Sequence, residues 1–354
     1  MAIENILGFP DECLMMVFRH LNMRDQCNFA YTCWRFQCIY QMIHKNHYRH
    51  FVWYERTNRW SELEIQSFFK LNGYKMQMLS LTDFRDHNME RLLTEGTEQG
   101  KAEHGDQEEG TEAKSQNVIK PSKTIYVAHI CGYLKNLRSL ILTIDHNSRE
   151  IIIEICRHMR QLQDLTISII KHPNYELLAL LPNLRNLDIE YFEMESDDKI
   201  FKTLSKLRPH TMQTLRIGTE LKTKQLRYIC QLSNINMLNI YNANSVALEY
   251  LLKMKNLTIL SLTDSIRLDN IDFMRLLCGL KTLSTLYVSY CQCLSNEFVF
   301  FAIKYLEQEM CSLRRLPFCL ECHRCGVVAD INQYPLVKSA LSIIHINFKN
   351  KPYD

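Results

Sequence analysis

The chain has 354 residues, of which 46% are hydrophobic and 23% charged, and its formal net charge is +3. These values are typical of a soluble globular protein and give no strong electrostatic field for nucleic acid. The sequence contains no secretory leader pattern and no apolar run long enough to span a bilayer. We therefore expect a cytoplasmic or nuclear protein without membrane contact.

Three short helices are predicted within the first 43 residues. Pro10 suits the first position of a helix, and Asp11 and Glu12 place negative charge at the positive end of its dipole. An apolar stripe at i, i+3, i+4 and i+7 follows, formed by Leu14, Val17, Phe18 and Leu21. Asp25 is the expected N-cap of the second helix, and Trp34 opens the apolar run of the third. Because three such helices cannot bury all their apolar groups alone, the sequence predicts a partner protein.

The segment from Leu7 to Ile39 resembles the F-box, the motif by which adaptors of cullin-based ubiquitin ligases bind the linker protein Skp. It departs from the family pattern at two positions. Gln26 stands where a leucine is usual in the family, and Phe36 stands where a tryptophan is usual. The resemblance implies docking on Skp, and through it on cullin. The Skp contacts that it implies are Phe9, Pro10, Leu14, Val17, Phe18, Leu21, Trp34 and Phe36. The alternative is an ordinary helical hairpin within a larger core.

Coupling helices are expected over residues 48–75, after an F-box of residues 1–47. Ser61 and Glu64 have the spacing of a capping box, and Gly73 is the expected stop. The preceding stretch, from His44 to Trp60, is basic and aromatic. We interpret it as an amphipathic helix with its rings turned inward, and contact with RNA is the alternative.

A strand signature of two apolar residues flanking one variable residue recurs from residue 76 to the end. It begins at Leu79, Leu140, Leu165, Leu187, Leu215, Leu238, Leu260, Leu286, Leu316 and Ile344. The spacing falls in or near the range of leucine-rich repeats, and helical segments lie between the signatures. The fold class is therefore predicted to be α/β, with about ten strand-helix units stacked into a leucine-rich-repeat solenoid over residues 76–354.

An acidic insertion interrupts this solenoid at residues 94–120. It combines seven Asp or Glu residues with four glycines and almost nothing apolar. Such a segment cannot offset its ordering entropy by burial, so we expect it to be disordered.

The target-binding surface is expected on the strand face, because alternate strand residues point to opposite sides. The residues between the inward leucines are Ile141, Thr166, Asp188, Arg216, Asn239, Ser261 and Tyr287. Of these, Asp188, Arg216, Asn239 and Tyr287 are the predicted target contacts, since Arg and Tyr are frequent in interface hot spots. A solvated strand face without a partner is the alternative.

The fourteen cysteines are mostly expected to be small buried hydrophobes in a reducing compartment. Cys319, Cys322 and Cys325, with Cys311 upstream, have a spacing that could hold structural zinc. No second CxxC pair completes the pattern, so we predict no metal and no cofactor.

Catalytic motifs are absent from the sequence: it has no nucleophile elbow, metalloprotease pair or dinucleotide fingerprint. We therefore predict a non-catalytic adaptor whose protein target is unknown. The alternative is a leucine-rich-repeat scaffold without a role in ubiquitin ligation.

Overall fold

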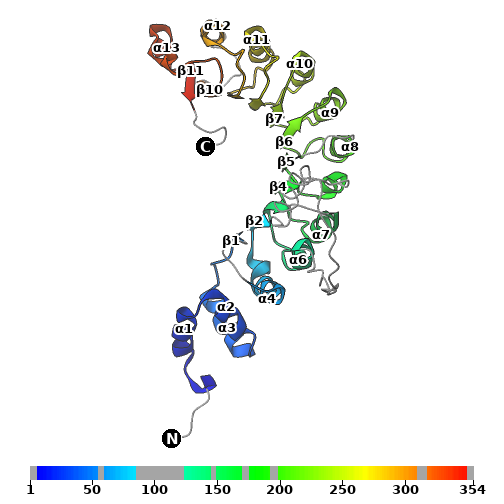
Figure 1. Cartoon of the computed structure of the whole chain (residues 1–354), viewed down its shortest axis with the longest axis vertical. Coiled ribbons are helices and arrows are strands. Elements are labelled where there is room, and N and C mark those ends of the chain that lie inside the picture. Colours follow the sequence, from blue (N-terminus) through cyan, green and yellow to red (C-terminus); the bar gives the residue numbers. More distant parts are fainter. Residues whose placement is uncertain are drawn as a thin grey trace, which may run out of the picture.

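The computed structural model describes residues 6–54, 60–84, 123–144, 149–169, 175–191, 198–308 and 317–348. The predicted acidic insertion, residues 94–120, and Cys311 lie outside these ranges. Within them, the chain forms a helical N-terminal end followed by a curved array of strand-helix units (Figure 1).

The three N-terminal helices are present as expected, after a short 3-10 turn η1 (Ile6–Gly8). They are α1 (Asp11–His20), α2 (Met23–Ala30) and α3 (Trp34–Ile43). Two details differ from the prediction. Pro10 is the N-cap of α1 rather than its first residue. Asn22 caps α2, because its Oδ1 accepts from the backbone N–H of Asp25 at 2.9 Å, so Asp25 lies inside the helix.

One parallel sheet of eleven strands runs through the rest of the described chain, with its strands in sequence order. The strands are β1 (His50–Tyr54), β2 (Met78–Phe84), β3 (Ser139–Ile144), β4 (Asp164–Ile169), β5 (Asn186–Tyr191), β6 (Thr214–Glu220), β7 (Met237–Tyr241), β8 (Ile259–Thr263), β9 (Thr285–Ser289), β10 (Phe318–His323) and β11 (Ile344–Phe348). Sequential order with a helix or turn after most strands confirms the solenoid.

Helical segments cover the outer side of the arc, and the strands line its inner side (Figure 1). They are α4 (Glu62–Asn72), η3 (Gly73–Lys75), α6 (Lys123–Ile130), η4 (Cys131–Tyr133), α7 (Arg149–His158), η5 (Tyr175–Leu180), α8 (Lys199–Leu207), α9 (Thr223–Ile229), α10 (Ser245–Leu251), α11 (Asn270–Gly279), α12 (Asn296–Gln308), η6 (Ala329–Gln333) and α13 (Pro335–Ser339).

The strand signature pairs in register through most of the sheet. The ladder runs through Leu79, Leu140, Leu165, Leu187, Leu215, Leu238, Leu260 and Leu286. All eight side chains are at most 1% exposed, so they form a continuous leucine core. In the last two units the ladder continues through Leu320, which pairs with Leu286, and through Ile346, which pairs with Leu320. The expected signature at Leu316 lies outside the described residues. The expected signature at Ile344 lies in β11, but Ile344 is two residues before the position that continues the ladder.

The first strand, β1, was not predicted, because residues 48–75 were expected to be helical throughout. Phe51 and Trp53 face the core while Val52 between them is 49% exposed, which is the period of a strand. Trp53 packs its ring against Trp60 and Phe68, with centroids 5.2 and 5.9 Å apart. A ring that is 1% exposed is not available for stacking on a base, which argues against the RNA alternative.

Helix α4 joins the N-terminal helices to the sheet. The expected capping box is present, with the Ser61 backbone N–H donating to Glu64 Oε2 at 2.7 Å. The close approach of Tyr133 explains Gly73, because a Cβ there would lie 2.8 Å from the Tyr133 carbonyl oxygen.

Several contacts cross between the N-terminal helices and the α4–η3 segment. Tyr31 Oη donates to the Ser67 carbonyl at 2.9 Å, and Gln41 Nε2 donates to the Leu71 carbonyl at 3.0 Å. Asn72 Nδ2 donates to Tyr40 Oη at 2.8 Å inside the core. An ion pair links Arg24 to Glu64. The three-helix end is thereby fixed to the first repeat.

Candidate protein-docking sites

Helix α1 presents two different faces. Leu14 and Phe18 point into the three-helix core and are 0% exposed. Phe18 packs edge-on against Phe29 and Phe36, whose own rings stack with centroids 4.3 Å apart. These contacts correct the sequence interpretation: Leu14, Phe18 and Phe36 hold the helices together and are not surface contacts for a partner.

The opposite face of α1 carries a second stripe at i, i+3, i+4 and i+7. It consists of Cys13, Met16, Val17 and His20, all exposed. Met16 is 60% exposed and Val17 41%. Phe9, just before the helix, is 50% exposed, and Trp34 at the start of α3 is 76% exposed. Exposed apolar side chains gathered on one small unit are typical of an interaction surface.

Arg35 fixes the segment that carries Phe9 and Pro10. Its Nε and one terminal nitrogen donate to Asp11 Oδ1 at 2.9 and 2.6 Å. The guanidinium also donates to the carbonyl of Phe9 at 2.7 Å and to that of Leu7. The segment before α1 is therefore held against the start of α3, the helix that begins at Trp34. The sequence pattern alone did not single out Arg35.

A groove runs between α3 and the α4–η3 segment, with a volume of about 490 Å³. Its lining is mostly apolar and is formed by Trp34, Gln37, Cys38, Gln41, Met42, Lys70, Leu71 and Tyr74. Trp34, Met42 and Tyr74 are each more than half exposed. Together with the outer face of α1, we call this surface the docking face.

Gln26 replaces the usual leucine for a structural reason. Its Nε2 donates to the carbonyls of Phe18 and Leu21, both at 2.8 Å, at the end of α1. Its Oε1 lies 2.6 Å from His44 Nε2. Gln26 thus provides a partner for the Leu21 carbonyl and a second one for the Phe18 carbonyl, which also accepts from the Leu21 backbone N–H at 3.1 Å. Leu21, another predicted contact, is only partly exposed beside this network.

A row of side chains crosses the sheet on the inner side of the arc. The strand pairing places the predicted residues Ile141, Thr166, Asp188, Arg216, Asn239, Ser261 and Tyr287 opposite one another, and extends the row to Glu321 and Asn347. We call these nine residues the concave row. The sequence reading missed its last two members because the register of the final repeats is displaced.

The four predicted target contacts differ in accessibility. Asp188 and Arg216 form an ion pair, with Oδ2 and a guanidinium nitrogen 3.7 Å apart and both side chains partly exposed. Burial raises the pKa of Asp188 to about 6, against the opposing effect of Arg216. Tyr287 is partly exposed. Asn239 is only 4% exposed, so it is not a surface contact, which corrects the prediction for that residue.

Of the C-terminal cysteines that the structure describes, Cys322 and Cys325 lie together, whereas Cys319 lies on the other face of β10. Cys322 is a core residue on β10, 1% exposed, whereas Cys319 shares the face of Glu321. A hydrogen bond between Cys322 and Cys325 raises the pKa of Cys322 and lowers that of Cys325. In the described part of the chain, no group of three or more His, Cys, Asp and Glu side chains could hold a metal ion.

The family comparison decides the nature of the N-terminal helices. Residues 6–39 match the F-box domain. This chain carries an F-box. The match spans η1, α1, α2 and most of α3, so it coincides with the unit that carries the exposed α1 stripe. The described chain therefore combines an F-box domain with a leucine-rich-repeat solenoid.

Solved structures with a similar arrangement share little sequence with this chain. A structure of the Rad7 and Elc1 complex in yeast aligns over 95% of this chain and 92% of the other, with 13% identity and a TM-score of 0.47. A leucine-rich repeat-containing protein, LegL7 from Legionella pneumophila, aligns over 82% and 80%, with 13% identity and a TM-score of 0.42. An internalin from Listeria monocytogenes aligns over 81% and 71%, with 14% identity and a TM-score of 0.37. No curated protein sequence matches the chain.

Among the described helices, none has both the length and the apolar character needed to cross a membrane.

Proposed function

We propose that this chain is the substrate-recognition adaptor of a cullin-based ubiquitin ligase, with the F-box docking on Skp and the solenoid binding a protein target. The observation that carries the proposal is the pairing of an F-box, whose outer face exposes Val17 and Trp34, with a separate concave row on the same rigid chain.

The docking face supplies what a helical partner needs. Phe9, Val17 and Trp34 are exposed, apolar and held in place by the Arg35 contacts and the three-helix core. An apolar groove of about 490 Å³ adjoins Trp34 and gives room for side chains of Skp. Burying such anchors is the usual source of binding energy in protein interfaces.

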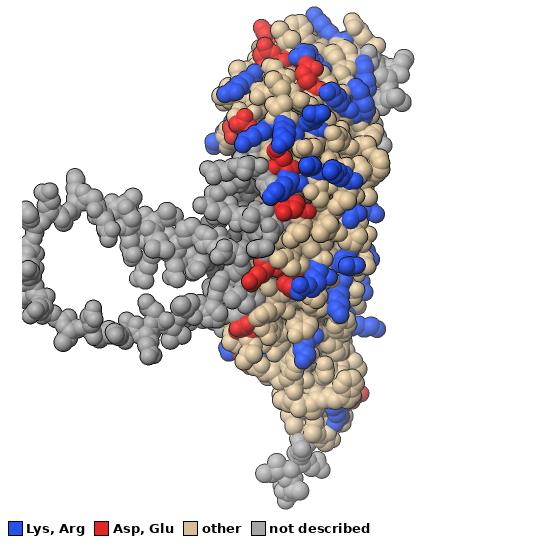
Figure 2. All heavy atoms as spheres, turned by 90° about the vertical axis from the view of Figure 1, so that its right-hand side faces the viewer, with Lys and Arg blue, Asp and Glu red and all other residues tan. Residues whose placement is uncertain are grey.

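The concave row is the preferred target surface. The outer, helical side displays interspersed Lys, Arg, Asp and Glu, as expected of a solvated surface (Figure 2). The inner side offers the partly exposed pair Asp188 and Arg216, and Tyr287 further along the concave row. A curved inner surface is the usual binding surface of a solenoid.

Ubiquitin transfer would then follow from proximity. A target held on the concave row is presented to the conjugating enzyme on cullin at a high effective concentration, without any catalytic residue of this chain. The scaffold alternative shares the concave row and lacks the ligase partners.

Affinity purification of the tagged full chain from cells, followed by mass spectrometry, separates these functions. The wild-type chain should recover Skp, cullin and ubiquitinated proteins. A Val17→Asp, Trp34→Asp variant should lose Skp and cullin. An Arg216→Glu, Tyr287→Ala variant should retain both but lose the targets. Recovery of the same targets by the wild-type chain without Skp or cullin would establish the scaffold function instead.

A further inference from the structure

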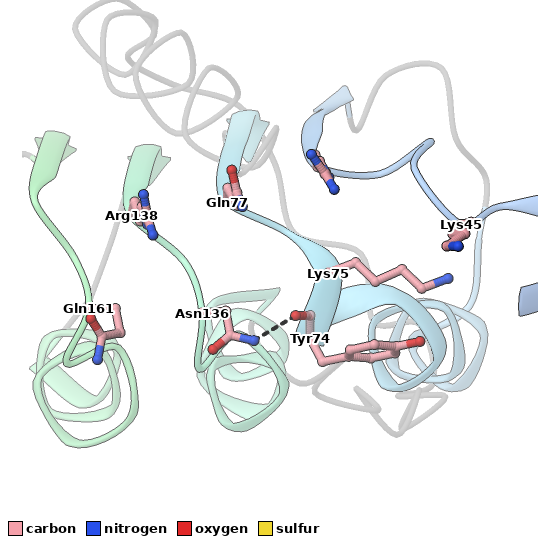
Figure 3. Close-up of a pocket in the computed structure, with 8 residues that line it drawn as sticks. Lys45, Tyr74, Lys75, Gln77, Asn136, Arg138 and Gln161 are labelled. Atoms are coloured by element: carbon pink, nitrogen blue, oxygen red, sulfur yellow. Dashed lines mark hydrogen bonds between the residues drawn. The ribbon is translucent and has the colours of Figure 1, made fainter.

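A hollow of about 360 Å³ lies on the outer edge of the molecule where the F-box end meets the first repeats. Its lining comes from successive loops that precede β1, β2, β3 and β4, and from η3. The lining residues are Lys45, Arg49, Tyr74, Lys75, Gln77, Asn136, Arg138 and Gln161 (Figure 3). The hollow is separate from both the α3 groove and the concave row, although Tyr74 contributes to the groove wall.

The charge of this hollow is one-sided. Four of its eight lining residues are cationic, and none is acidic. No ion pair is formed by Lys45, Arg49, Lys75 or Arg138 within the described ranges. Lys75 is partly buried; its Nζ donates to the carbonyl of His44 at 3.3 Å and lies 5.5 Å from the centre of the Tyr74 ring. Burial without an anionic partner lowers the pKa of Lys75.

Backbone hydrogen bonds fix the backbone positions of two of the arginines, whose side chains are exposed. The N–H groups of Gln77 and Met78 donate to the Arg49 carbonyl at 2.8 and 2.9 Å, and that of Arg138 donates to the Gln77 carbonyl at 2.8 Å. Arg49, Gln77 and Arg138 are therefore equivalent positions of consecutive repeats. Because neighbouring strands are about 4.8 Å apart, the two arginine backbones lie about 10 Å apart with Gln77 between them.

The floor of the hollow is also fixed. Asn136 Nδ2 donates to the Tyr74 carbonyl at 2.8 Å, which ties the loop before β3 to η3 (Figure 3). Tyr74 Oη donates to Gln41 Oε1 at 2.8 Å. These bonds hold Asn136 and Tyr74, two polar members of the lining, in place beside the cations.

We propose that this hollow binds a small anion carrying two or more linked phosphate groups, with Arg49 and Arg138 as its main contacts. Guanidinium groups match phosphate oxygens in a bidentate manner, and lysines add point charges to the same anion. The volume is that of a small-molecule site. The proposal does not depend on Skp or on a protein target, so its failure would leave the adaptor function standing.

Isothermal titration calorimetry of the full chain with sodium tripolyphosphate, at physiological ionic strength, tests the site. We expect saturable 1:1 binding that weakens at least tenfold in an Arg49→Ala, Arg138→Ala variant. Arg185→Ala is the matched control, because Arg185 precedes β5 at an equivalent position outside the hollow. Its affinity should stay within twofold of the wild type.

A second variant guards against misfolding of the double variant. Lys45→Gln alters an exposed side chain and should weaken binding about threefold or more while the melting temperature without ligand stays unchanged. The proposal is overturned by no binding at millimolar tripolyphosphate, or by equal affinity in the wild type and both hollow variants. It is also overturned if a doubly phosphorylated peptide binds the hollow more tightly than tripolyphosphate, because the ligand would then be a protein segment.

Discussion

At the scale of single residues, the F-box core depends on a buried polar network that its apolar pattern conceals. Gln26 donates to the carbonyl of Phe18 in α1 and to that of Leu21 just after the helix, and it also contacts His44, which is only 8% exposed. The sequence analysis identifies Gln26 only as a departure from the leucine that is usual at this position of the F-box. The contacts instead give Gln26 a role within the fold, which could not be predicted because His44 lies 18 residues away.

This network predicts a loss of stability in mild acid. Burial, assisted by His47 and Lys75, lowers the pKa of His44 from 6.5 to about 4. Above pH 6.5 the ring is neutral in both states, and stability falls as the pH drops toward 4 because only the unfolded chain takes up the proton. Between pH 7 and pH 5 this amounts to about 2 kcal/mol. Urea denaturation at both pH values should show it, and His44→Gln should show a smaller drop. An equal drop in both proteins would contradict this role of His44.

Asp188 on the concave row provides a second prediction at this scale. Burial is the main cause that raises its pKa to about 6, Glu190 adds to the increase, and Arg216 opposes it. Replacing Arg216 by Gln removes the opposing charge, so the pKa of Asp188 should rise further. A carboxyl ¹³C titration by NMR measures both values. A pKa that falls or stays constant in the variant would show that the ion pair has no electrostatic effect.

At the scale of elements, the repeats are shaped by backbone contacts between neighbouring units as well as by the buried leucines of the ladder. Asn242, Asp264, Tyr290 and Arg324 follow β7, β8, β9 and β10, and all have positive φ angles between 48° and 58°. The first three each donate a backbone N–H to a carbonyl of the next unit. Asn and Asp are enriched in this conformation, so they can indicate it in a sequence. Tyr and Arg are not enriched in it and give no such signal. This regular turn was therefore hidden from the sequence analysis.

Gly218 gives the element-scale prediction. A Cβ on this residue would lie 1.7 Å from the Glu190 carbonyl oxygen, so β5 and β6 must move apart in Gly218→Ala. We expect a loss of about 1–3 kcal/mol in unfolding free energy. Gly132→Ala is the matched control, because no atom lies within 4 Å of its added Cβ. Thermal unfolding of both variants measures the difference, and equal melting temperatures would contradict the close approach.

At the scale of the whole molecule, the sequence predicted the architecture because the leucine spacing and the helical stripe reflect the burial that organises the fold. Eight ladder leucines and all three F-box helices lie where the pattern placed them. The site was predicted less well. An apolar stripe marks both core and docking residues, and only the packed structure separates Phe18 inside from Val17 outside. Strand β1 was missed because its five residues, in which buried and exposed side chains alternate, were assigned to a helix.

The charge distribution also becomes clear only at this scale. The insertion at residues 94–120 carries a formal charge of −4, so the remaining chain carries +7 although the whole is +3. The average charge therefore hid a basic hollow at the junction of F-box and solenoid.

The central claim is that the outer face of the F-box helices docks on Skp. Light scattering of the purified full chain mixed with Skp tests it most directly, with the wild type and two variants compared by molar mass. We predict a 1:1 complex for the wild type and for Ile271→Asp, which alters an apolar side chain 70% exposed on α11. Val17→Asp, Trp34→Asp should give separate components while its melting temperature stays near that of the wild type. A complex of unchanged affinity in this double variant, or none with the folded wild type at micromolar concentration, would contradict the account.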